Sequence, residues 1–207
     1  MKLYHDLRAP NPRRVRIYLA EKDLAARGVA IELVEVSIAA RANEAPAYLE
    51  KNPLGLLPLL ELDDGRIIRE SIAICRYFEE LYPEPPLFGE GAWERAQVEE
   101  WSRHAELLLL VPIAQVFRNT HAFWAGRIPQ IAEAGALARA QVEQRMGWLD
   151  GVLADRRFLA GDRFSIADIT ALCGLDFGKI SNLRIKPEHA HLSRWHAEVS
   201  SRPSAKA

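Results

Sequence analysis

The sequence is poor in cysteine, in charge of one sign and in long hydrophobic runs. Its 207 residues include only two cysteines, Cys75 and Cys173, which form neither a Cys-x-x-Cys pair nor a metal-ligand spacing. Each lies in an apolar helical pattern, so we expect both to be small, reduced core residues. The cysteine content therefore indicates a protein without a disulfide framework and without a metal centre.

The charge balance and the hydropathy exclude several further classes. Basic and acidic residues number 27 and 28, for a net charge of -1, which does not favour nucleic acid or an anionic membrane as the main partner. No apolar run approaches the roughly 20 residues that cross a bilayer. The N-terminal segment reaches charged residues before any apolar stretch of signal-peptide length. We expect a cytoplasmic protein.

The first 82 residues alternate between strand and helix patterns. A strand pattern at residues 31–36 alternates apolar and acidic side chains, and Asp63-Asp64-Gly65 is a hairpin signal. The order strand, helix, strand, helix, hairpin, helix predicts a thioredoxin-like domain. The predicted strands span residues 2–7, 31–36, 57–62 and 66–68, and the predicted helices span residues 12–26, 44–51 and 71–82.

The pattern changes after Pro83, where a proline-rich connector begins. No strand is predicted beyond it. We expect a thioredoxin-like domain at residues 1–83, a linker at 84–91 and an all-helical domain at 92–207, which is an α/β plus all-α fold. The predicted helices of the second domain span residues 92–123 (bent at Pro112), 131–153, 165–180 and 190–200.

Two short motifs in the first domain together resemble a peptide clamp. A residue beside a cis proline, here Leu57 before Pro58, can offer its backbone N–H and C=O to an extended peptide. Glu70 and Ser71 open the third helix, where N–H groups and a hydroxyl can hold a carboxylate. Taken singly, Leu57-Pro58 is more typical of a turn before a strand, and Ser71 of an ordinary N-cap.

Three segments, in the same order and at the same separations, carry a family resemblance. The chain resembles the soluble, cytosolic-type bacterial glutathione S-transferase superfamily over essentially its whole length. The resemblance implies a thioredoxin-like domain followed by a helical bundle. The matching segments are residues 52–60 (Asn-Pro-Leu-Gly-Leu-Leu-Pro-Leu-Leu), 70–74 (Glu-Ser-Ile-Ala-Ile) and 158–168 (Phe-Leu-Ala-Gly-Asp-Arg-Phe-Ser-Ile-Ala-Asp).

The resemblance implies that the bound peptide is glutathione, the co-substrate of the family. By similarity, Leu57 beside Pro58 would bind the cysteinyl part through its main chain. Glu70 would pair with the γ-glutamyl ammonium, and Ser71 with the γ-glutamyl carboxylate. Near the C-terminal end of the matching region, Ser165 and Asp168 form a capping-box pattern and are expected to be structural.

The loop that usually carries the thiol donor departs from the family pattern. Residues 7–15 contain no Ser, Thr, Cys or Tyr. Asn11 is the best remaining donor, and Ala9-Pro10-Asn11 resembles the Thr-Pro-Asn loop of bacterial Nu-class relatives with alanine in place of threonine. The alternative is that Asn11 only caps the first helix, with Pro12 at its first position.

The glycine end of glutathione has no obvious cation. Leu56 occupies a position that often carries Lys or Gln in relatives, so the candidates are Arg13, Arg41 and Lys51. The sequence does not choose among them. Arg13 is also a candidate donor to the sulfur.

The second substrate is expected against the long helix after residue 92. Trp101, His104, Leu108 and Val111 lie at helical spacing and would form an apolar wall, continued by Pro112 and Gln115. Phe117, Arg118 and Trp124 could close the pocket. Such a stripe is more often core than pocket, and we assign no catalytic histidine to it.

Three functions are consistent with these features. The first is a glutathione transferase acting in detoxification on a small hydrophobic electrophile, working as a homodimer with Arg76 and Trp93 near the dimer face. The second is a glutathione-dependent disulfide or peroxide reductase. The third is a non-enzymatic binding or scaffold protein on the same fold. The clamp residues favour the transferase, because a scaffold would not need them.

Overall fold

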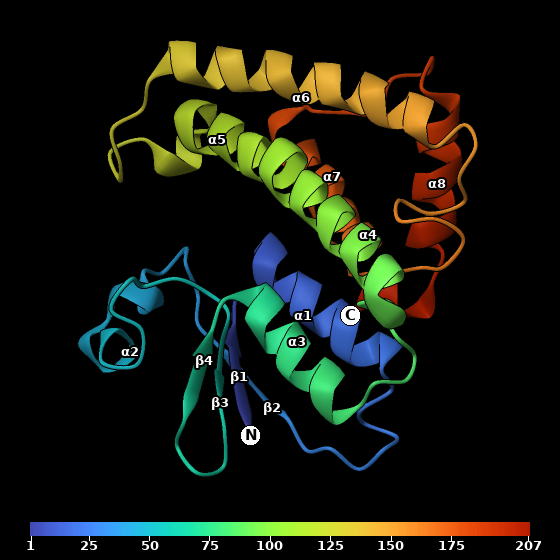
Figure 1. The fold of residues 1–207 in the computed structure, drawn as a ribbon. Coiled ribbons are helices and arrows are strands. Elements are labelled where there is room, and N and C mark those ends of the chain that lie inside the picture. The colour runs from blue at the N-terminus through green and yellow to red at the C-terminus, as the bar shows by residue number, and fades with distance from the viewer. The chain divides into compact units, whose positions relative to one another are not determined.

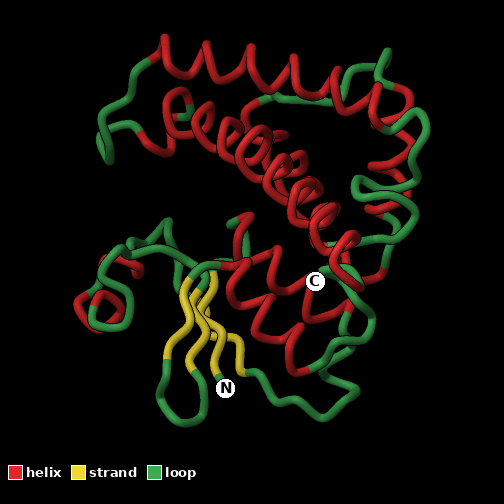
Figure 2. The backbone as a smooth tube through the Cα atoms, viewed as in Figure 1, coloured by secondary structure: helices red, strands yellow, loops and turns green.

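The computed structural model describes residues 1–207, which form two compact units. The first unit comprises Met1–Pro86 together with Lys206–Ala207, and the second comprises Leu87–Ala205. Strands occur in the first unit and the second is helical, as Figures 1 and 2 show. No helix is both long enough and apolar enough to cross a membrane.

The first unit is built on a four-stranded mixed sheet. The strands lie in the order β2-β1-β3-β4, with β1 and β2 parallel and the other two pairings antiparallel. A parallel pair requires a crossover, which α1 supplies between β1 and β2. The strands are β1 (Lys2–His5), β2 (Glu32–Glu35), β3 (Leu59–Glu61) and β4 (Ile67–Arg69).

Two helices of this unit, α1 and α3, lie side by side against one face of the sheet (Figure 1). Their inward positions are apolar and fully buried, for example Val15 and Ile74. This arrangement confirms the thioredoxin-like fold. The helices are α1 (Pro10–Glu21), α2 (Pro46–Leu49) and α3 (Ser71–Leu81), with a 3₁₀ turn at Ala42–Glu44.

Several predicted bounds of the first unit are corrected by the structure. The first strand ends at His5 rather than at residue 7, and α1 ends at Glu21 rather than at residue 26. The helix expected at residues 44–51 is instead a 3₁₀ turn followed by the four-residue α2. The break falls before Pro46, because proline has no N–H and restricts the preceding residue to extended backbone.

A buried lysine fixes the end of the first unit. The Lys22 side chain is fully buried, and its ammonium lies 2.5 Å from Glu79 Oε2. It also donates to the carbonyl oxygens of Tyr82, Pro83 and Pro85, at 2.8, 3.2 and 2.5 Å. Four oxygens thus compensate the cost of burying the charge. The lysine joins the end of α1 to the segment that follows α3.

The second unit contains five α-helices and one π-helical segment. Within it α6 packs along α5, and α7 packs against α4, α5 and the π-helical segment (Figure 1). Short 3₁₀ turns occur at Ala122–Trp124, Lys179–Ser181 and Pro203–Lys206. The helices are α4 (Gly91–Arg103), α5 (Val111–Thr120), α6 (Ala132–Val152), α7 (Ile166–Gly178) and α8 (Ala190–Ser200).

The long helix expected at residues 92–123 is interrupted differently from the prediction of a simple bend. A π-helical segment, His104–Leu110, joins α4 to α5 directly ahead of Pro112. Proline removes one helix N–H, and its ring crowds the carbonyl four residues earlier. A wider turn upstream relieves that crowding and keeps the chain helical.

Helix α7 is the centre of the second unit. All its residues except Asp176 and Phe177 are buried, which fits the near-continuous apolar pattern of its sequence. It begins with a capping box. The Ser165 side chain accepts from the backbone N–H groups of the first turn, and the Asp168 side chain accepts from the Ser165 N–H. Both cysteines are buried and neither is in a disulfide, Cys173 in α7 and Cys75 in α3.

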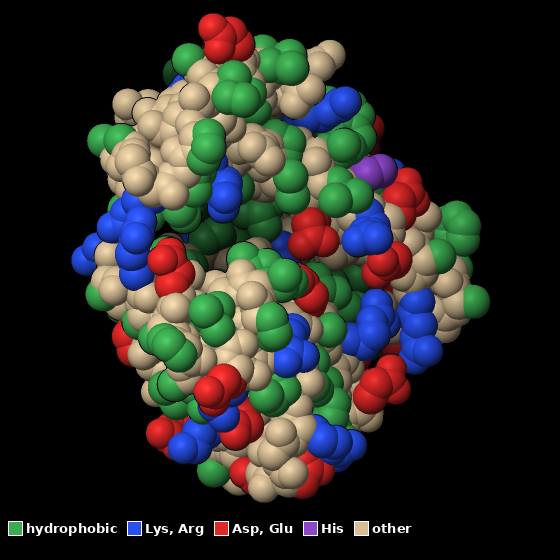
Figure 3. Space-filling view, turned by 90° about the vertical axis from the view of Figure 1, so that its left-hand side faces the viewer, with side chains coloured by type: hydrophobic (Ala, Val, Ile, Leu, Met, Phe, Trp, Pro, Cys, Tyr) green, Lys and Arg blue, Asp and Glu red, His purple; other side chains and the backbone are tan.

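Figure 3 shows that basic and acidic side chains are interspersed with hydrophobic ones over the face that it draws, which agrees with the balanced composition.

Candidate functional site

Sheet register brings the main candidate residues of the first unit to one end of the sheet. Leu59 pairs with Tyr4 of β1 and with Arg69 of β4, both antiparallel. The segment before β3, which holds Leu57, therefore lies beside the segment after β4, which holds Glu70. The loop after β1 emerges at the same end. The candidate donor and the two clamp motifs thus lie at the same end of the sheet.

The loop after β1 is fixed by side chains beneath it. Asp6 is buried, and its carboxylate accepts from the backbone N–H groups of Arg8 and Ile38, each at 2.8 Å. Arg16 donates through Nη2 to the Leu7 carbonyl at 3.0 Å. These bonds position the start of α1 before any ligand binds.

The first helix starts one proline earlier than predicted. Ala9 is the N-cap residue, with φ -79° and ψ 137°, and Pro10 is the first helical residue. The alternative reading, in which Asn11 caps the helix and Pro12 follows at the first position, is therefore wrong. Both prolines have the fixed φ that suits a first turn, and the earlier one begins the helix.

Asn11 consequently lies in the first turn with free donors. Its side chain is exposed and makes no hydrogen bond. Pro10 and Pro12 have no N–H, and the Arg13 N–H donates to the Ala9 carbonyl at 3.2 Å. Asn11 thus supplies the one unbonded backbone N–H of this helix start as well as an amide NH₂. An anion at this point would meet both.

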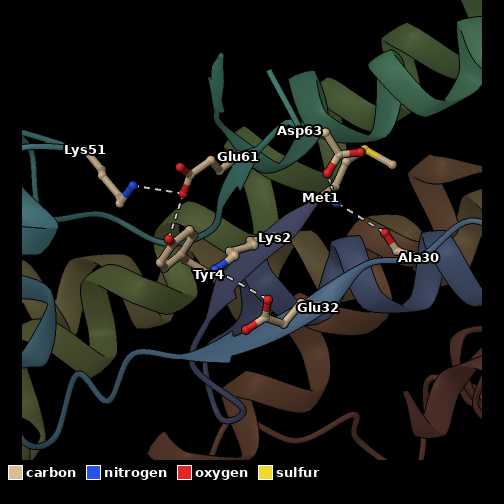
Figure 4. Close-up of polar contacts among 8 residues, drawn as sticks. All are labelled: Met1, Lys2, Tyr4, Ala30, Glu32, Lys51, Glu61 and Asp63. Atoms are coloured by element: carbon tan, nitrogen blue, oxygen red, sulfur yellow. Dashed lines mark hydrogen bonds and ion pairs between the residues drawn. The ribbon is translucent and has the colours of Figure 1, made fainter. Parts of the chain in front are cut away.

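Tyr4, the tyrosine nearest in sequence to the loop after β1, is hydrogen-bonded to Glu61. Its hydroxyl donates to Glu61 Oε2 at 2.7 Å, and the Lys51 ammonium lies 2.9 Å from the same oxygen (Figure 4). Burial and the Glu61 hydrogen bond raise the pKa of Tyr4. The hydrogen bond to Glu61 likewise raises the pKa of Lys51. Lys51, a candidate for the glycine carboxylate, is thus paired with Glu61 in this structure.

Leu57, just before β3, has an unpaired backbone N–H and C=O. Its peptide bond to Pro58 is cis, the residue is 8% exposed, and neither its N–H nor its C=O makes a hydrogen bond. The preceding carbonyl, of Leu56, is held by Tyr48 Oη at 2.6 Å and Asn52 Nδ2 at 2.7 Å. The backbone is therefore anchored at one peptide and unpaired at the next. Buried backbone groups are almost always paired, so this pair marks a place where another chain can bond.

Glu70 is held in an unusual backbone conformation. It is the N-cap residue of α3, with φ 72° and ψ 123°, and its exposed carboxylate makes no hydrogen bond or ion pair. A non-glycine residue at positive φ costs about 1–3 kcal/mol and is typical of functional sites. Ser71 follows as the first helical residue and is not the N-cap, which corrects the N-cap alternative for it.

Arg14 is a residue of this edge that the sequence analysis missed. Its side chain is fully buried, and Nη1 donates to the Ser71 hydroxyl oxygen at 2.7 Å. The hydroxyl hydrogen of Ser71 remains available to a ligand, and the guanidinium adds positive potential at the start of α3. The signal in the sequence was a charged residue, Arg14, between the apolar residues Pro12 and Val15 of the first helix, both of which are buried.

The other candidate cations are less directly placed. Arg13 is half-buried in the first turn of α1. Arg41 has φ 58°, and its side chain is half-exposed, 3.9 Å from Glu44. The structure does not bring either residue into contact with Leu57 or Glu70.

The expected second-substrate residues divide into two groups. Trp101, which is 5% exposed, stacks on Trp148 of α6 with ring centroids 5.6 Å apart, and the His104 ring meets both at 5.2 and 5.5 Å. These rings take part in the packing of the helical unit. Leu108 is half-buried and Val111 is 43% exposed, so both have surface for a ligand.

The residues expected to close that pocket form an aromatic group of their own. Phe117 meets Trp124 edge to face at 6.1 Å, and the Arg118 guanidinium lies 4.9 Å from the centroid of the Trp124 ring. Cation–π contacts of this kind are worth about 0.5–2 kcal/mol.

Asp168 has four hydrogen bonds that explain its burial. Oδ1 accepts from the Leu159 N–H at 2.9 Å and from Trp195 Nε1 at 2.8 Å. Oδ2 accepts from the N–H and hydroxyl of Ser165, at 3.0 and 3.2 Å. Burial raises the pKa of Asp168 despite these donors. The group joins α7 to α8 and to the loop before it.

Comparison with known proteins covers both units. Residues 3–86 match the family model for the glutathione S-transferase N-terminal domain, and residues 112–203 match that for the C-terminal domain. Glutathione S-transferase 2 of Saccharomyces cerevisiae is 35% identical over all of this chain and 88% of its own.

Solved structures agree with the sequence comparison. The structure of Gtt2 from Saccharomyces cerevisiae superposes with a TM-score of 0.92 at 35% identity, over 100% of this chain and 99% of that one. A glutathione S-transferase domain-containing protein from Marinobacter aquaeolei gives the same TM-score and identity over 99% of both chains.

One further relative is not named as a transferase. Elongation factor 1-gamma of Prunus avium is 34% identical over 86% of this chain but only 42% of its own length. The whole-length matches to transferases and the two family models outweigh this partial one. The chain belongs to the glutathione S-transferase family and is an enzyme of that family.

Proposed function

We propose that this enzyme binds glutathione along the unpaired backbone of Leu57 and joins its thiolate to a small hydrophobic electrophile. The observation that carries the proposal is the unpaired backbone of Leu57 beside the unpaired carboxylate of Glu70 at one end of the sheet. An extended peptide with a free ammonium at one end is complementary to that pair.

The γ-glutamyl end would bind at the start of α3. Its ammonium would pair with the Glu70 carboxylate, and its carboxylate would accept from the Ser71 hydroxyl and the orphan N–H groups of the helix. Arg14, 2.7 Å behind the hydroxyl, would polarise it. The cysteinyl part would bond the N–H and the C=O of Leu57. Pro58, which has no N–H to donate to a sheet, would leave these Leu57 groups outside the hydrogen bonding of β3.

The thiol would be activated by the start of α1. A free thiol has a pKa of about 8.5, and lowering it by about two units needs about 2.7 kcal/mol of preferential thiolate stabilisation. Asn11 offers an amide NH₂ and a backbone N–H at a helix N-terminus, which together are of that size. The half-match of this loop to the Nu-class motif supports the same role.

The reaction then balances without a further reactant. Glutathione loses its thiol proton to solvent, and the thiolate attacks an electrophilic carbon. A carbon–sulfur bond forms as the bond to the leaving group breaks, and that group departs with the electron pair. For the electrophile we propose the wall of Trp101, His104, Leu108 and Val111, where the last two offer apolar surface.

The remaining assignments follow from family membership. We propose the division into a glutathione-binding domain (1–83), a linker (84–91) and an electrophile-binding helical domain (92–207). We also propose a cytoplasmic homodimer with a role in detoxification. For the glycine carboxylate, Arg13 and Lys51 stay the candidates, and Lys51 would have to leave Glu61.

Calorimetric titration with glutathione, with the ultraviolet absorbance of the thiolate followed across pH, tests this proposal. The proposal expects saturable binding and a thiol pKa well below that of free glutathione. Absence of binding by the folded protein would overturn it.

A further inference from the structure

A cavity of about 250 Å³ lies in the second unit, where the chain passes from α7 to α8. Its floor is aliphatic: Leu175 and Leu183 are 3% and 2% exposed, and Ile185 is half-buried beside them. Ligand pockets of drug size start at about 300 Å³, so this one suits a smaller molecule with a short apolar body.

The segment that forms this cavity is anchored on both sides. Arg139 of α6 donates to the Ser181 carbonyl at 2.6 Å, and Lys186 pairs with Glu143 of α6 at 3.2 Å. Asn182, with φ 56°, turns the chain between these anchors. The cavity is therefore a built feature of the helical unit.

The rim of the cavity is basic. Lys179, Arg184 and His196 line it, and no acidic side chain does. With histidine counted as neutral, the single negative charge of Asp176 balances the Lys179 ammonium, 2.5 Å away, and the same oxygen lies 3.0 Å from His196 Nε2. One basic group of the rim thus has no counter-charge.

That group is Arg184. Its side chain makes no hydrogen bond and no ion pair, and it is exposed at the mouth of the cavity. A guanidinium presents a planar fork of donors that fits a carboxylate with two parallel hydrogen bonds. The Ser193 hydroxyl, which also lines the cavity, adds a further donor.

The charge count selects the class of anion. One uncompensated positive charge over an aliphatic floor matches a single negative charge on an aliphatic chain. A phosphate dianion would bring a second charge that nothing here balances and no apolar body for the floor. We propose that this cavity binds a short-chain aliphatic monocarboxylate, its head on Arg184 and its chain on Leu175 and Leu183.

All the lining residues belong to the second unit, so the inference does not rest on the proposed glutathione site. The test is calorimetric titration of the full chain with hexanoate, hexanol and acetate. Hexanol keeps the chain without the charge, and acetate keeps the charge without the chain. We expect hexanoate to bind at least about tenfold more tightly than either, because each probe lacks one of the two contacts.

Two variants locate the binding. Arg184→Gln is expected to weaken hexanoate binding about tenfold or more, the effect of losing a charge-assisted pair. Arg145→Gln is the matched control, because Arg145 is an arginine of the same unit that makes no polar contact and does not line the cavity. It should bind as the unmodified protein does.

A filling variant guards against an indirect effect of the charge change. Ser193 is exposed, so Ser193→Trp can occupy the cavity without disturbing the core, and it should abolish hexanoate binding. Equal binding of hexanoate and hexanol, or hexanoate binding that survives both Arg184→Gln and Ser193→Trp, would overturn the proposal.

Discussion

Replacement of Asn11 by alanine tests the proposed origin of the thiolate. The change removes the exposed amide NH₂ of the first turn of α1 and leaves the backbone N–H in place. A hydrogen bond to a charged group contributes about 1.5–3 kcal/mol, and one pKa unit corresponds to about 1.4 kcal/mol. Because sulfur is a weak acceptor, we take the lower bound and expect the pKa of bound glutathione to rise by about one unit.

The expected rise has a distinct pH signature. If the bound thiol has a pKa of about 6.5, the variant should hold about threefold less thiolate at pH 7 and about eightfold less at pH 6. At pH 9 both proteins should hold nearly all of it. The thiolate absorbance of the bound peptide, measured by stopped flow across this range, gives both titration curves directly.

Two comparisons make the assay specific. Leu7→Ala changes an exposed, uncharged side chain of the same loop and should leave the curve unchanged. S-methylglutathione has no thiol proton, so its affinity should be the same for Asn11→Ala and the unmodified protein. An unshifted thiol pKa in Asn11→Ala would refute the assignment of Asn11 as the donor.

Three further changes test other parts of the structure. Glu70→Gln should weaken glutathione binding about tenfold or more in calorimetry without moving the thiol pKa, because only the ammonium contact is lost. Lys22→Met should lower the free energy of unfolding by about 3 kcal/mol in urea titrations, since the Glu79 carboxylate loses the ammonium that lies 2.5 Å away. Burial, and then the Arg16 guanidinium, lower the pKa of His5. The unfolded chain therefore takes up this proton first as the pH falls. Stability from this group is complete above a pH of about 6.5 and is lost below it, so His5→Gln should reduce the fall in urea midpoint between about pH 7.5 and 5.5.

Contrary results would be equally informative. Unchanged affinity in Glu70→Gln would place the ammonium elsewhere. A Lys22→Met protein as stable as the parent would mean that the four oxygens around the ammonium do not offset its desolvation. An identical pH dependence in His5→Gln would assign the acid sensitivity to other groups.

The fold was predictable where local signals and topology agree. The alternation at residues 31–36 and the turn Asp63-Asp64-Gly65 each specify a strand or hairpin, and the crossover helix between parallel strands follows from chain geometry. The capping box at Ser165 and Asp168 was also readable, because both partners lie within one turn of α7.

What the sequence could not reveal depends on contacts between distant residues or on near-equal alternatives. Pro10 and Pro12 suit a helix start equally well, and the choice between them decides whether Asn11 caps the helix or lies inside it. The Arg14–Ser71 bond joins residues 57 apart in the chain. The π-helical segment needs the three-dimensional crowding around Pro112.

The backbone motifs of the site could be predicted from the sequence, but the side chains that hold them in place could not. Leu57-Pro58 and Glu70-Ser71 lie together because β3 and β4 pair antiparallel, which brings the start of β3 beside the end of β4. The Tyr48 hydroxyl and the Asn52 amide, which hold the neighbouring carbonyl, had no sequence signal of such a role.

Leu57 and Glu70 are proposed to form the two contacts that hold extended glutathione. A crystal structure of the protein with glutathione tests it most directly. We expect the cysteinyl backbone to bond both the N–H and the C=O of Leu57, and the γ-glutamyl ammonium to pair with Glu70. Glutathione bound elsewhere, with the Leu57 backbone still unpaired, would contradict it.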